Sequence, residues 1–375
     1  MTDGEKPIRL LIFIHDLAPF GAQRVALTSL QAAPRGPLEV TVCSFWGDET
    51  LAGEFESAGA KLVMLRARRY LDLAAWRRLF RLLRELKPDI VQTNLPELSV
   101  PVRVFSVLAG AAKVFHAVQN PFSSEPWYWR LLNLLTLRLC AGLAYSSRSI
   151  MEEAALPGWA VPAITLVIQN GMAIAPAPAG AREELRSTLA IRPEETAICC
   201  VARLCGQKGQ DILLAAAARL VGEGRKIKVL LAGDGETEPE LRAMTERLGL
   251  AGKVLFLGRR DDIPSVLAAS DIYAGPSRWE GLGLALGEAM LAGKPCAASA
   301  ISGHADILFD GVTGLAVPKE DMAALAGAIA SLMDDPGRGS KLASAGGELI
   351  SREFSVGAMA EKYMRTYYLM GRKDS

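Results

Sequence analysis

The chain has 375 residues, of which 50% are hydrophobic and 22% are charged, with 42 Lys and Arg residues against 41 Asp and Glu residues. This composition is typical of a globular protein and excludes a disordered or fibrous chain. The length suggests about two or three domains. A net charge of +1 argues against a protein that binds nucleic acid through its overall charge.

Neither a targeting signal nor a metal-binding pattern is evident. No apolar run approaches the roughly 18 residues that a membrane-spanning helix needs. The first residues include Asp3 and Glu5, whereas a signal peptide begins with basic residues. The six cysteines contain no Cys-x-x-Cys pair, and the chain has only three histidines. We therefore expect buried, reduced thiols in a cytoplasmic protein without a metal site built from histidines.

Short apolar segments alternate with segments of helical periodicity along the whole chain. Strands are predicted at 9–14, 38–43, 61–65, 89–93, 113–118, 142–145, 197–202, 226–231, 253–257, 271–275 and 295–299. Helices are predicted at 23–32, 71–86, 126–140, 182–189, 210–220 and 356–369. Continuous apolar strands that alternate with helices favour parallel sheets covered on both faces. We expect an α/β fold with two doubly wound, Rossmann-like domains facing each other across a cleft.

The alternation pauses between Asn170 and Pro193, where proline, glycine and alanine are frequent. Such a composition is typical of a linker. We therefore predict an N-terminal domain at residues 1–170, a linker at 171–192 and a C-terminal domain at 193–352. The last segment, 353–375, is predicted to hold a helix that packs back toward the N-terminal domain.

In open parallel sheets, ligands bind beyond the carboxyl ends of the strands, so the loops after the strands are the candidates for a site. Arg203 and Lys208 lie with two glycines between the strand at 197–202 and the next helix. The two cations can bind phosphate oxygens, and the glycines allow the backbone to approach a ligand closely. An ordinary solvated basic turn explains the same residues.

The loop after the strand at 271–275 is rich in glycine, with Gly281, Gly283 and Gly287 at the expected start of a helix. Each costs about 1 kcal/mol in a helix relative to alanine. Backbone N–H groups that must contact an anion would account for them. In the loop after 295–299, Gly303 could line the same pocket, whereas His304 is expected to be an exposed loop residue.

Two carboxylates belong to the same glycine-rich loop. Glu280 and Glu288 are eight residues apart, or roughly 12 Å along a helix. This is about the reach from the sugar of a nucleotide-sugar to its ribose, and each carboxylate can accept two hydrogen bonds from vicinal hydroxyls. A purely structural alternative for Glu280 is a capping box with Ser277.

Taken together, these segments resemble the donor domain of the retaining family 4 glycosyltransferases, which have the GT-B fold. The resemblance spans about 160 residues in matching order and spacing, so it is much more specific than a single glycine motif. The matching pieces are Val201–Gly209, Leu231–Gly235, Val254–Gly258, Ala269–Asp271, Glu280–Met290 and Asp310–Leu315.

The first half resembles the acceptor domain of the same family more loosely. The matching pieces are Pro19–Arg24, Asp89–Asn94, Lys113–His116, Tyr145–Ser147 and Ile168–Gly171. Phe20 stands where the family usually has the first of two glycines, the second being Gly21. The segment that ends at Asn94 lacks a histidine found in many members, and an Asp that often follows Asn170-Gly171 is absent.

The resemblance implies a hexosyltransferase that moves a sugar from a nucleotide-sugar, by family frequency a UDP-sugar, to a glycan or lipid-linked acceptor in cell-surface polysaccharide synthesis. It assigns catalytic roles to His116, Arg203, Lys208 and Glu280, and donor binding to Arg203, Lys208, Glu280, Gly281, Leu282, Gly283 and Glu288. Gly21 would lie in an acceptor or diphosphate loop. No Asp-x-Asp occurs in the chain, so we expect no metal and no other cofactor.

Residues Arg66–Lys87 combine eight basic residues with leucines at roughly helical spacing. Such a helix could lie on an anionic membrane as a peripheral anchor on the inner face. An ordinary amphipathic helix with a solvated basic edge needs the same periodicity. Trp127–Arg130 opens the next long helix, and its aromatic residues fit either a membrane interface or a core.

Two other functions are compatible with the same fold. A nucleotide-sugar 2-epimerase would convert its substrate without an acceptor. A non-catalytic partner subunit would bind a nucleotide without hydrolysis or transfer. A dehydrogenase is disfavoured, because the glycine-rich turn does not follow the first strand and lacks the acidic residue of a dinucleotide fingerprint.

Overall fold

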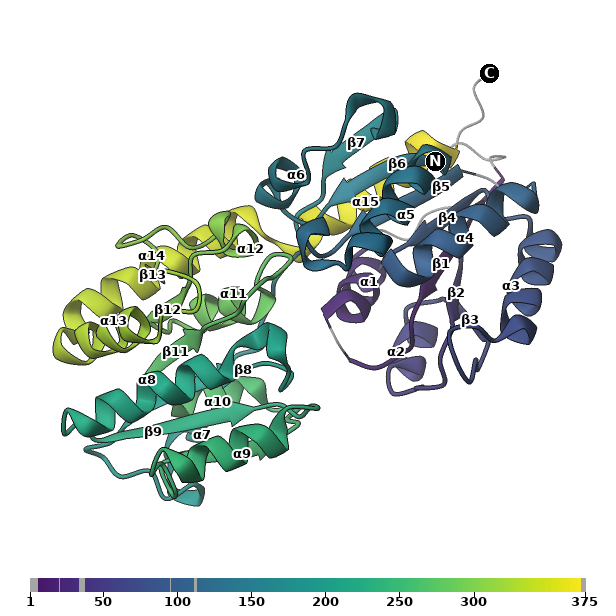
Figure 1. The fold of residues 1–375 in the computed structure, drawn as a ribbon. Coiled ribbons are helices and arrows are strands. Elements are labelled where there is room, and N and C mark those ends of the chain that lie inside the picture. The colour runs from purple at the N-terminus through teal and green to yellow at the C-terminus, as the bar shows by residue number, and fades with distance from the viewer. Residues whose placement is uncertain (1–5, 20, 34–37, 95, 111–112, 372–375) are drawn as a thin grey trace. The chain divides into compact units, whose positions relative to one another are not determined.

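The computed structural model describes residues 6–19, 21–33, 38–94, 96–110 and 113–371. The chain forms two compact units, shown in Figure 1. Unit 1 comprises Met1–Gly171 and Val356–Ser375, and unit 2 comprises Met172–Ser355. Each unit is a parallel sheet with helices on both faces, which confirms the prediction of two Rossmann-like domains.

Unit 1 contains a seven-stranded sheet in the order β3-β2-β1-β4-β5-β6-β7, with every adjacent pair parallel. Its strands are β1 (Ile8–Ile14), β2 (Leu38–Ser44), β3 (Lys61–Met64), β4 (Ile90–Thr93), β5 (Lys113–Val118), β6 (Cys140–Tyr145) and β7 (Ile164–Val167). Its helices are α1 (Gly21–Gln31), α2 (Ala52–Ser57), α3 (Leu73–Leu86), α4 (Pro96–Leu108), α5 (Trp127–Thr136), α6 (Arg148–Ala154) and α15 (Val356–Gly371), with short 3₁₀ turns η1 (Phe122–Ser124), η2 (Leu137–Leu139) and η3 (Gly158–Ala160).

Unit 2 contains a six-stranded parallel sheet in the order β10-β9-β8-β11-β12-β13. Its strands are β8 (Thr196–Val201), β9 (Ile227–Ala232), β10 (Val254–Gly258), β11 (Ile272–Gly275), β12 (Cys296–Ser299) and β13 (Leu315–Val317). Its helices are α7 (Ala181–Thr188), α8 (Gln210–Gly222), α9 (Glu238–Arg247), α10 (Ile263–Ala269), α11 (Leu284–Leu291), α12 (Ser302–Ala305), α13 (Met322–Asp334) and α14 (Pro336–Glu353), with a 3₁₀ turn η4 (Gly206–Lys208).

Sequence periodicity missed the edge strands β7 and β13 and misplaced one helix end. Both strands are short, and β7 is only half-buried, so neither forms a long apolar run. The helix predicted at 126–140 ends at Thr136, where the last turn tightens into η2 and Cys140 begins β6. The leucines continue the helical period past the point where the chain must turn into the sheet.

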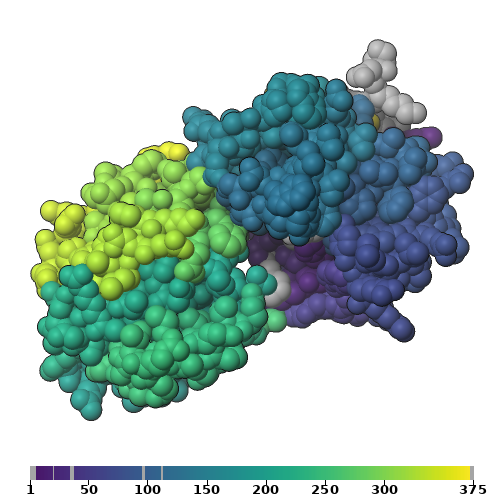
Figure 2. Space-filling view, viewed as in Figure 1, coloured from purple at the N-terminus to yellow at the C-terminus, as the bar shows by residue number. Residues whose placement is uncertain are grey.

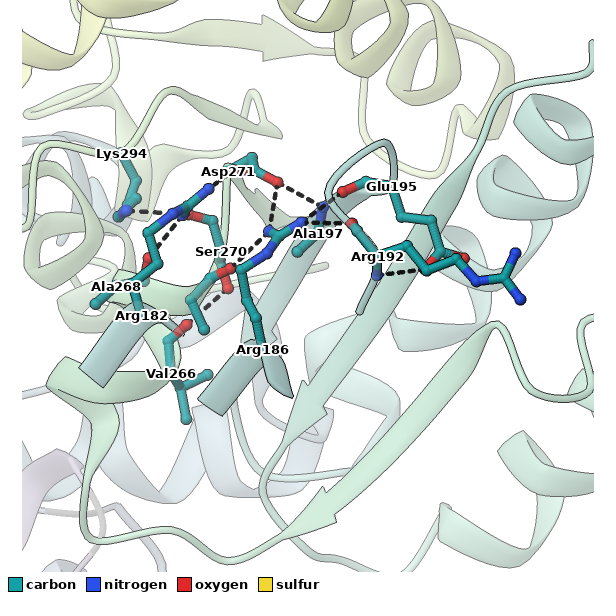
Figure 3. Close-up of polar contacts among 11 residues, drawn as sticks. Arg182, Arg186, Arg192, Glu195, Ala197, Val266, Ala268, Ser270, Asp271 and Lys294 are labelled. Carbon is teal, nitrogen blue, oxygen red and sulfur yellow. Dashed lines mark hydrogen bonds and ion pairs between the residues drawn. The ribbon is translucent and has the colours of Figure 1, made fainter. Parts of the chain in front are cut away.

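The predicted linker at 171–192 differs from the structure, because α7 packs into unit 2 (Figure 3). Arg182 and Arg186 both hold the carboxylate of Asp271 at the start of β11, with N–O distances of 2.6 and 3.0 Å. Leu185 joins the apolar core beneath them. The proline- and alanine-rich composition is confined to the segment before α7. Composition therefore places the start of the C-terminal domain too late in the chain.

The terminal helix α15 packs within unit 1, against α1, β1 and β4. The Tyr367 hydroxyl donates to the side chain of Gln92 in β4. The ring of Tyr367 also packs edge-on against Phe115 of β5, with ring centroids 6.1 Å apart. The last helix therefore belongs to the N-terminal unit and packs on its sheet, although the chain before it belongs to unit 2.

The basic helix within 66–87 is an ordinary amphipathic helix. In α3, capped by the Asp72 carboxylate, the apolar side chains of Trp76, Leu79 and Leu83 are buried in the core of unit 1. Its arginines are exposed. The apolar side chains along the middle of α3 are thus occupied by the core, while its arginines and the first residue, Leu73, are exposed.

All six cysteines are free and buried, as the sequence predicts. Burial raises the pKa of the Cys199 thiol to about 11. Within the described ranges, no helix is both long and apolar enough to cross a membrane.

Candidate functional site

The loops that follow β8, β11 and β12 meet at the carboxyl edge of the unit 2 sheet. Arg278, in the loop after β11, donates to the carbonyl of Gly206 and to both carboxylate oxygens of Asp211, over distances of 2.7 to 3.0 Å. The side-chain amide of Gln207 donates to the carbonyl of Trp279. These bonds fix the β8 and β11 loops against each other, so the residues they carry are held in place together.

Lys208 and Glu280 form the central ion pair of these loops. The Lys208 ammonium lies 2.6 Å from Oε1 of Glu280, and the Ser277 hydroxyl donates to the same oxygen over 2.8 Å. The two side chains are only 22% and 13% exposed. Burial raises the pKa of Glu280, but the Lys208 ammonium, the neighbouring His304 and the two hydrogen bonds lower it by a larger amount, so its net pKa is below the ordinary value. Oε2 accepts no bond from the described residues, which leaves it available to a ligand.

The structure contradicts the capping box and the single-helix spacing. Helix α11 begins only at Leu284, with Gly283 as its N-cap at a φ of 73°. Ser277 therefore caps no helix and instead binds the Glu280 carboxylate. Since Glu280 lies in the loop and Glu288 in α11, the estimate of roughly 12 Å from helical rise does not apply to them. The left-handed conformation of Gly283 ends the loop where the capping pattern predicted a helix.

Two other residues of the glycine-rich loop have structural roles. The Leu282 side chain is buried in the apolar core, and the whole residue is only 1% exposed. Gly287 lies inside α11, where a Cβ would collide with Sδ of Met172. The Met172 side chain fills the space beside Gly287, and the Gly287 N–H donates to the Gly283 carbonyl within the helix. The prediction that this N–H contacts an anion is therefore wrong.

His304 was expected to be exposed and is instead buried in α12, with 2% exposure. Its Nδ1 lies 2.9 Å from the carbonyl oxygen of Ser299, which can only accept, so Nδ1 carries the proton. A Cβ at Gly283 would lie 2.5 Å from the imidazole Cδ2. Burial lowers the pKa of His304, and Glu280 offsets this only in part. The imidazole ring packs directly against Gly283, a contact that the sequence does not predict. The only signal in the sequence is that His304 follows Gly303, which belongs to a predicted ligand loop.

Arg203 and Glu288 complete the predicted donor set. Arg203 is exposed just after β8, and its carbonyl accepts from the side chain of Gln210 over 2.9 Å. Glu288 is half-buried in α11. The predicted donor residues Arg203, Lys208, Glu280, Gly281, Leu282, Gly283 and Glu288 therefore all belong to the loops and helix starts of one unit.

His116 and Gly21 belong to unit 1. His116 is buried inside β5, and its Nδ1 lies 2.9 Å from Thr93 Oγ1 and 3.2 Å from the Thr93 carbonyl oxygen. Burial and the positive charge of Arg103 lower the pKa of His116 well below its ordinary value, so the ring is neutral at pH 7. Gly21 is the exposed first residue of α1, and the preceding Phe20 lies outside the described residues.

A small cavity in unit 1 lies where β1 and β4 end and α1 begins. Its lining includes His15, Gln23, Asn94 and Ser99. The side-chain nitrogen of Asn94 is buried without a hydrogen-bond partner among the described residues. An unpaired buried donor beside polar neighbours is suited to hold a water molecule or a ligand hydroxyl. In the part of the chain that the structure describes, no group of three or more His, Cys, Asp or Glu side chains is placed to hold a metal ion.

Comparison with protein families accounts for both units. Residues 181–348 match the family described as glycosyl transferases group 1, and residues 20–173 match glycosyltransferase family 4. The chain belongs to the family 4 glycosyltransferases. The predicted family is thereby confirmed, and both halves of the fold are covered by it.

Among relatives, the UDP-Gal:alpha-D-GlcNAc-diphosphoundecaprenol alpha-1,3-galactosyltransferase of Escherichia coli is 26% identical over 84% of this chain and 85% of its own length. The alpha-D-kanosaminyltransferase of Streptomyces kanamyceticus is 29% identical over 51% of this chain, and the match spans only 50% of that relative. Among solved structures, Anabaena Alr3699/HepE in complex with UDP and glucose has a TM-score of 0.84 and 22% identity over 96% of this chain and 99% of its own. This glycosyltransferase family 4 chain thus has the GT-B fold.

Proposed function

We propose that this protein is a retaining glycosyltransferase that moves a sugar from a UDP-sugar to a glycan or lipid-linked acceptor in cell-surface polysaccharide synthesis, at the cytoplasmic face of a membrane. The observation that carries the proposal is the fixed Lys208–Glu280 pair beside the glycine turn at the carboxyl edge of the unit 2 sheet. Two relatives support the donor and acceptor classes. The name of the E. coli relative includes UDP-Gal and a diphosphoundecaprenol acceptor, and HepE was crystallised with UDP-glucose.

The proposed chemistry begins with the bond between sugar and diphosphate. Its cleavage places negative charge on the leaving phosphate, which preorganised cations and N–H groups stabilise. Arg203, Lys208 and the backbone of the Gly281–Gly283 turn supply these groups. The open Oε2 of Glu280 accepts hydrogen bonds from sugar hydroxyls, and Glu288 binds the ribose.

Retention is proposed without a protein nucleophile. A two-carboxylate double displacement needs carboxyl groups about 5 Å apart across the reacting bond, whereas Glu280 and Glu288 grip opposite ends of the donor. His116 is assigned a place near the anomeric carbon. As its ring is neutral and its Nδ1 is bound by Thr93, only Nε2 is left for a substrate.

The test is a transfer assay with a panel of UDP-sugars and lipid-linked acceptors, and NMR of the product anomer. Glu288→Ala should mainly weaken donor binding, and His116→Ala should reduce turnover more than donor affinity. The reverse pattern would exchange their roles. Conversion of the donor without an acceptor would indicate a 2-epimerase, and nucleotide binding without hydrolysis or transfer would indicate a non-catalytic subunit.

A further inference from the structure

Helix α4 exposes apolar residues near its C-terminal end, although Leu98 and Val102 of the same helix join the core of unit 1. Val104, Val107 and Leu108 are exposed, whereas the polar residues Arg103 and Ser106 are fully buried. A surface helix of a globular protein normally has the opposite arrangement, with its charged side chains in water. The orientation of α4 thus suits an apolar environment outside the protein.

Helix α5 packs beside α4 and presents apolar residues outward and a polar residue inward. Trp127, Leu131 and Leu135 recur every four residues and are 75%, 48% and 54% exposed. Asn133, on the opposite side, is fully buried. Figure 1 shows the two helices side by side on one face of the sheet, and this blue-to-teal layer forms the surface of unit 1 toward the viewer in Figure 2.

A buried polar network fixes this orientation. Arg103 donates through Nη1 to Asn133 Oδ1 and Thr136 Oγ1, both over 3.0 Å, and Asn133 donates to Glu125 Oε2 over 2.8 Å. Rotating α5 to bury its leucines would break these bonds and leave the buried Arg103 guanidinium without Asn133 and Thr136, which is strongly unfavourable. The outward apolar face is therefore a built feature of α4 and α5.

Exposed arginines lie beside the apolar face, and the segments that carry its residues contain no acidic side chain. Arg130 and Arg138 are exposed along α5 and η2, and Arg138 stacks over the ring of Trp159, 5.1 Å from its centroid. The sequence has no Asp or Glu in 98–108 or in 127–139. The exposed arginines of neighbouring α3 extend the basic rim. An apolar centre with a basic rim is complementary to an anionic lipid surface.

We propose that the α4–α5 face, defined by Val104, Val107, Leu108, Trp127, Tyr128, Leu131 and Leu135, rests in the interfacial layer of an anionic membrane. Leucine and valine side chains enter the acyl boundary, the aromatic rings lie at headgroup level and the arginines pair with lipid phosphates. This inference builds on the membrane location in the proposed function. It can fail independently of the proposed sugar transfer, because lipid binding and sugar transfer are measured separately.

The experiment is co-sedimentation of the full chain with vesicles of phosphatidylglycerol and phosphatidylcholine, and with phosphatidylcholine alone. Leu131→Glu/Leu135→Glu is compared with Phe309→Glu/Val312→Glu, which charges two exposed apolar positions of unit 2. We expect the first pair to weaken binding to anionic vesicles on the order of tenfold or more. The unit 2 variant should bind like the wild type. Added salt should weaken vesicle binding of the wild type and of the unit 2 variant alike.

Two further readouts keep the proposal open to refutation. Vesicles should shift the tryptophan emission of the wild type to the blue, and Trp127→Phe should remove much of this shift while the thermal unfolding temperature stays the same. Equal vesicle binding by wild type and Leu131→Glu/Leu135→Glu would overturn the proposal. So would a wild type that binds no vesicles but forms a dimer that the same variant dissociates, since the face would then join two copies of the chain.

Discussion

Nζ of Lys208 lies 2.6 Å from Oε1 of Glu280, although the two residues are 72 positions apart in the chain. Lys208 ends the 3₁₀ turn after β8, and Glu280 lies in the loop after β11. The two strands are neighbours in the sheet, so their carboxyl ends bring the loops together. Both side chains are largely withdrawn from water, so removing either one leaves the charge of the other uncompensated.

Replacing Lys208 by Met should lower stability by about 3 kcal/mol, because it strands a buried carboxylate. The double variant Lys208→Met/Glu280→Gln should recover part of that loss. Urea unfolding of the wild type, both single variants and the double variant measures the coupling, which we expect to be on the order of 1–3 kcal/mol. Additive single effects would show that the pair contributes nothing in solution.

The buried His304 should make stability depend on pH. Its folded pKa is below the ordinary value of 6.5, so the unfolded chain binds a proton more readily. The stability that comes from the neutral ring is present above pH 6.5 and is lost as the pH falls below it. His304→Asn retains a donor for Ser299 but does not titrate. The advantage of the wild type over this variant, measured by thermal unfolding, should shrink between pH 7.5 and 5; a constant difference would contradict the buried, neutral ring.

Two helical glycines should respond oppositely to alanine. Gly327 in α13 has open space around it, so Gly327→Ala should stabilise by about 0.5–1 kcal/mol. Gly287→Ala should destabilise by about 1–3 kcal/mol, since its Cβ would collide with Met172. Both are measured by urea unfolding. A stabilised Gly287→Ala would mean that Met172 repacks freely.

The Arg182–Asp271–Arg186 contact should hold α7 on unit 2. Asp271→Asn should destabilise by about 2 kcal/mol and increase amide exchange across Ala181–Thr188. Asp334→Asn, which breaks the exposed pair with Arg225, is the matched control and should change little. Unchanged exchange in α7 after Asp271→Asn would contradict the role given to this contact.

Sugar transfer should not require a divalent metal ion. The chain has no Asp-x-Asp, and the proposed charge stabilisation comes from Arg203, Lys208 and backbone N–H groups. Activity should persist in excess EDTA and should not rise with added Mn²⁺. Loss of activity in EDTA that Mn²⁺ restores would overturn this expectation.

Much of the fold follows from sequence pattern, because continuous apolar strands and helical periods are local signals. The strands β1, β5 and β8 lie within one or two residues of their predicted limits. The edge strand β13 has only three residues and carries no readable period. Helix α7 was assigned to a linker because the bonds that hold it, from Arg182 and Arg186, reach residues more than 80 positions away.

The site was predictable in its residue types and less so in its geometry. Lys208 and Glu280 were both named from their loops, but their direct contact depends on strand order. His304 was misjudged because a loop position in sequence gives no measure of burial, which comes from the approach of the Gly283 turn. The Ser277–Glu280 spacing fits a cap equally well, and only the left-handed Gly283 shows where the helix begins.

The measurement that tests the donor site most directly is thermal unfolding of the wild type and Glu288→Ala with UDP, GDP, ADP and their common sugar conjugates. A ligand that binds only the folded chain raises its unfolding temperature. We predict selective stabilisation of the wild type by UDP and a UDP-sugar, and its loss in Glu288→Ala. Absence of stabilisation by any nucleotide would contradict the donor site proposed for the loops after β8 and β11.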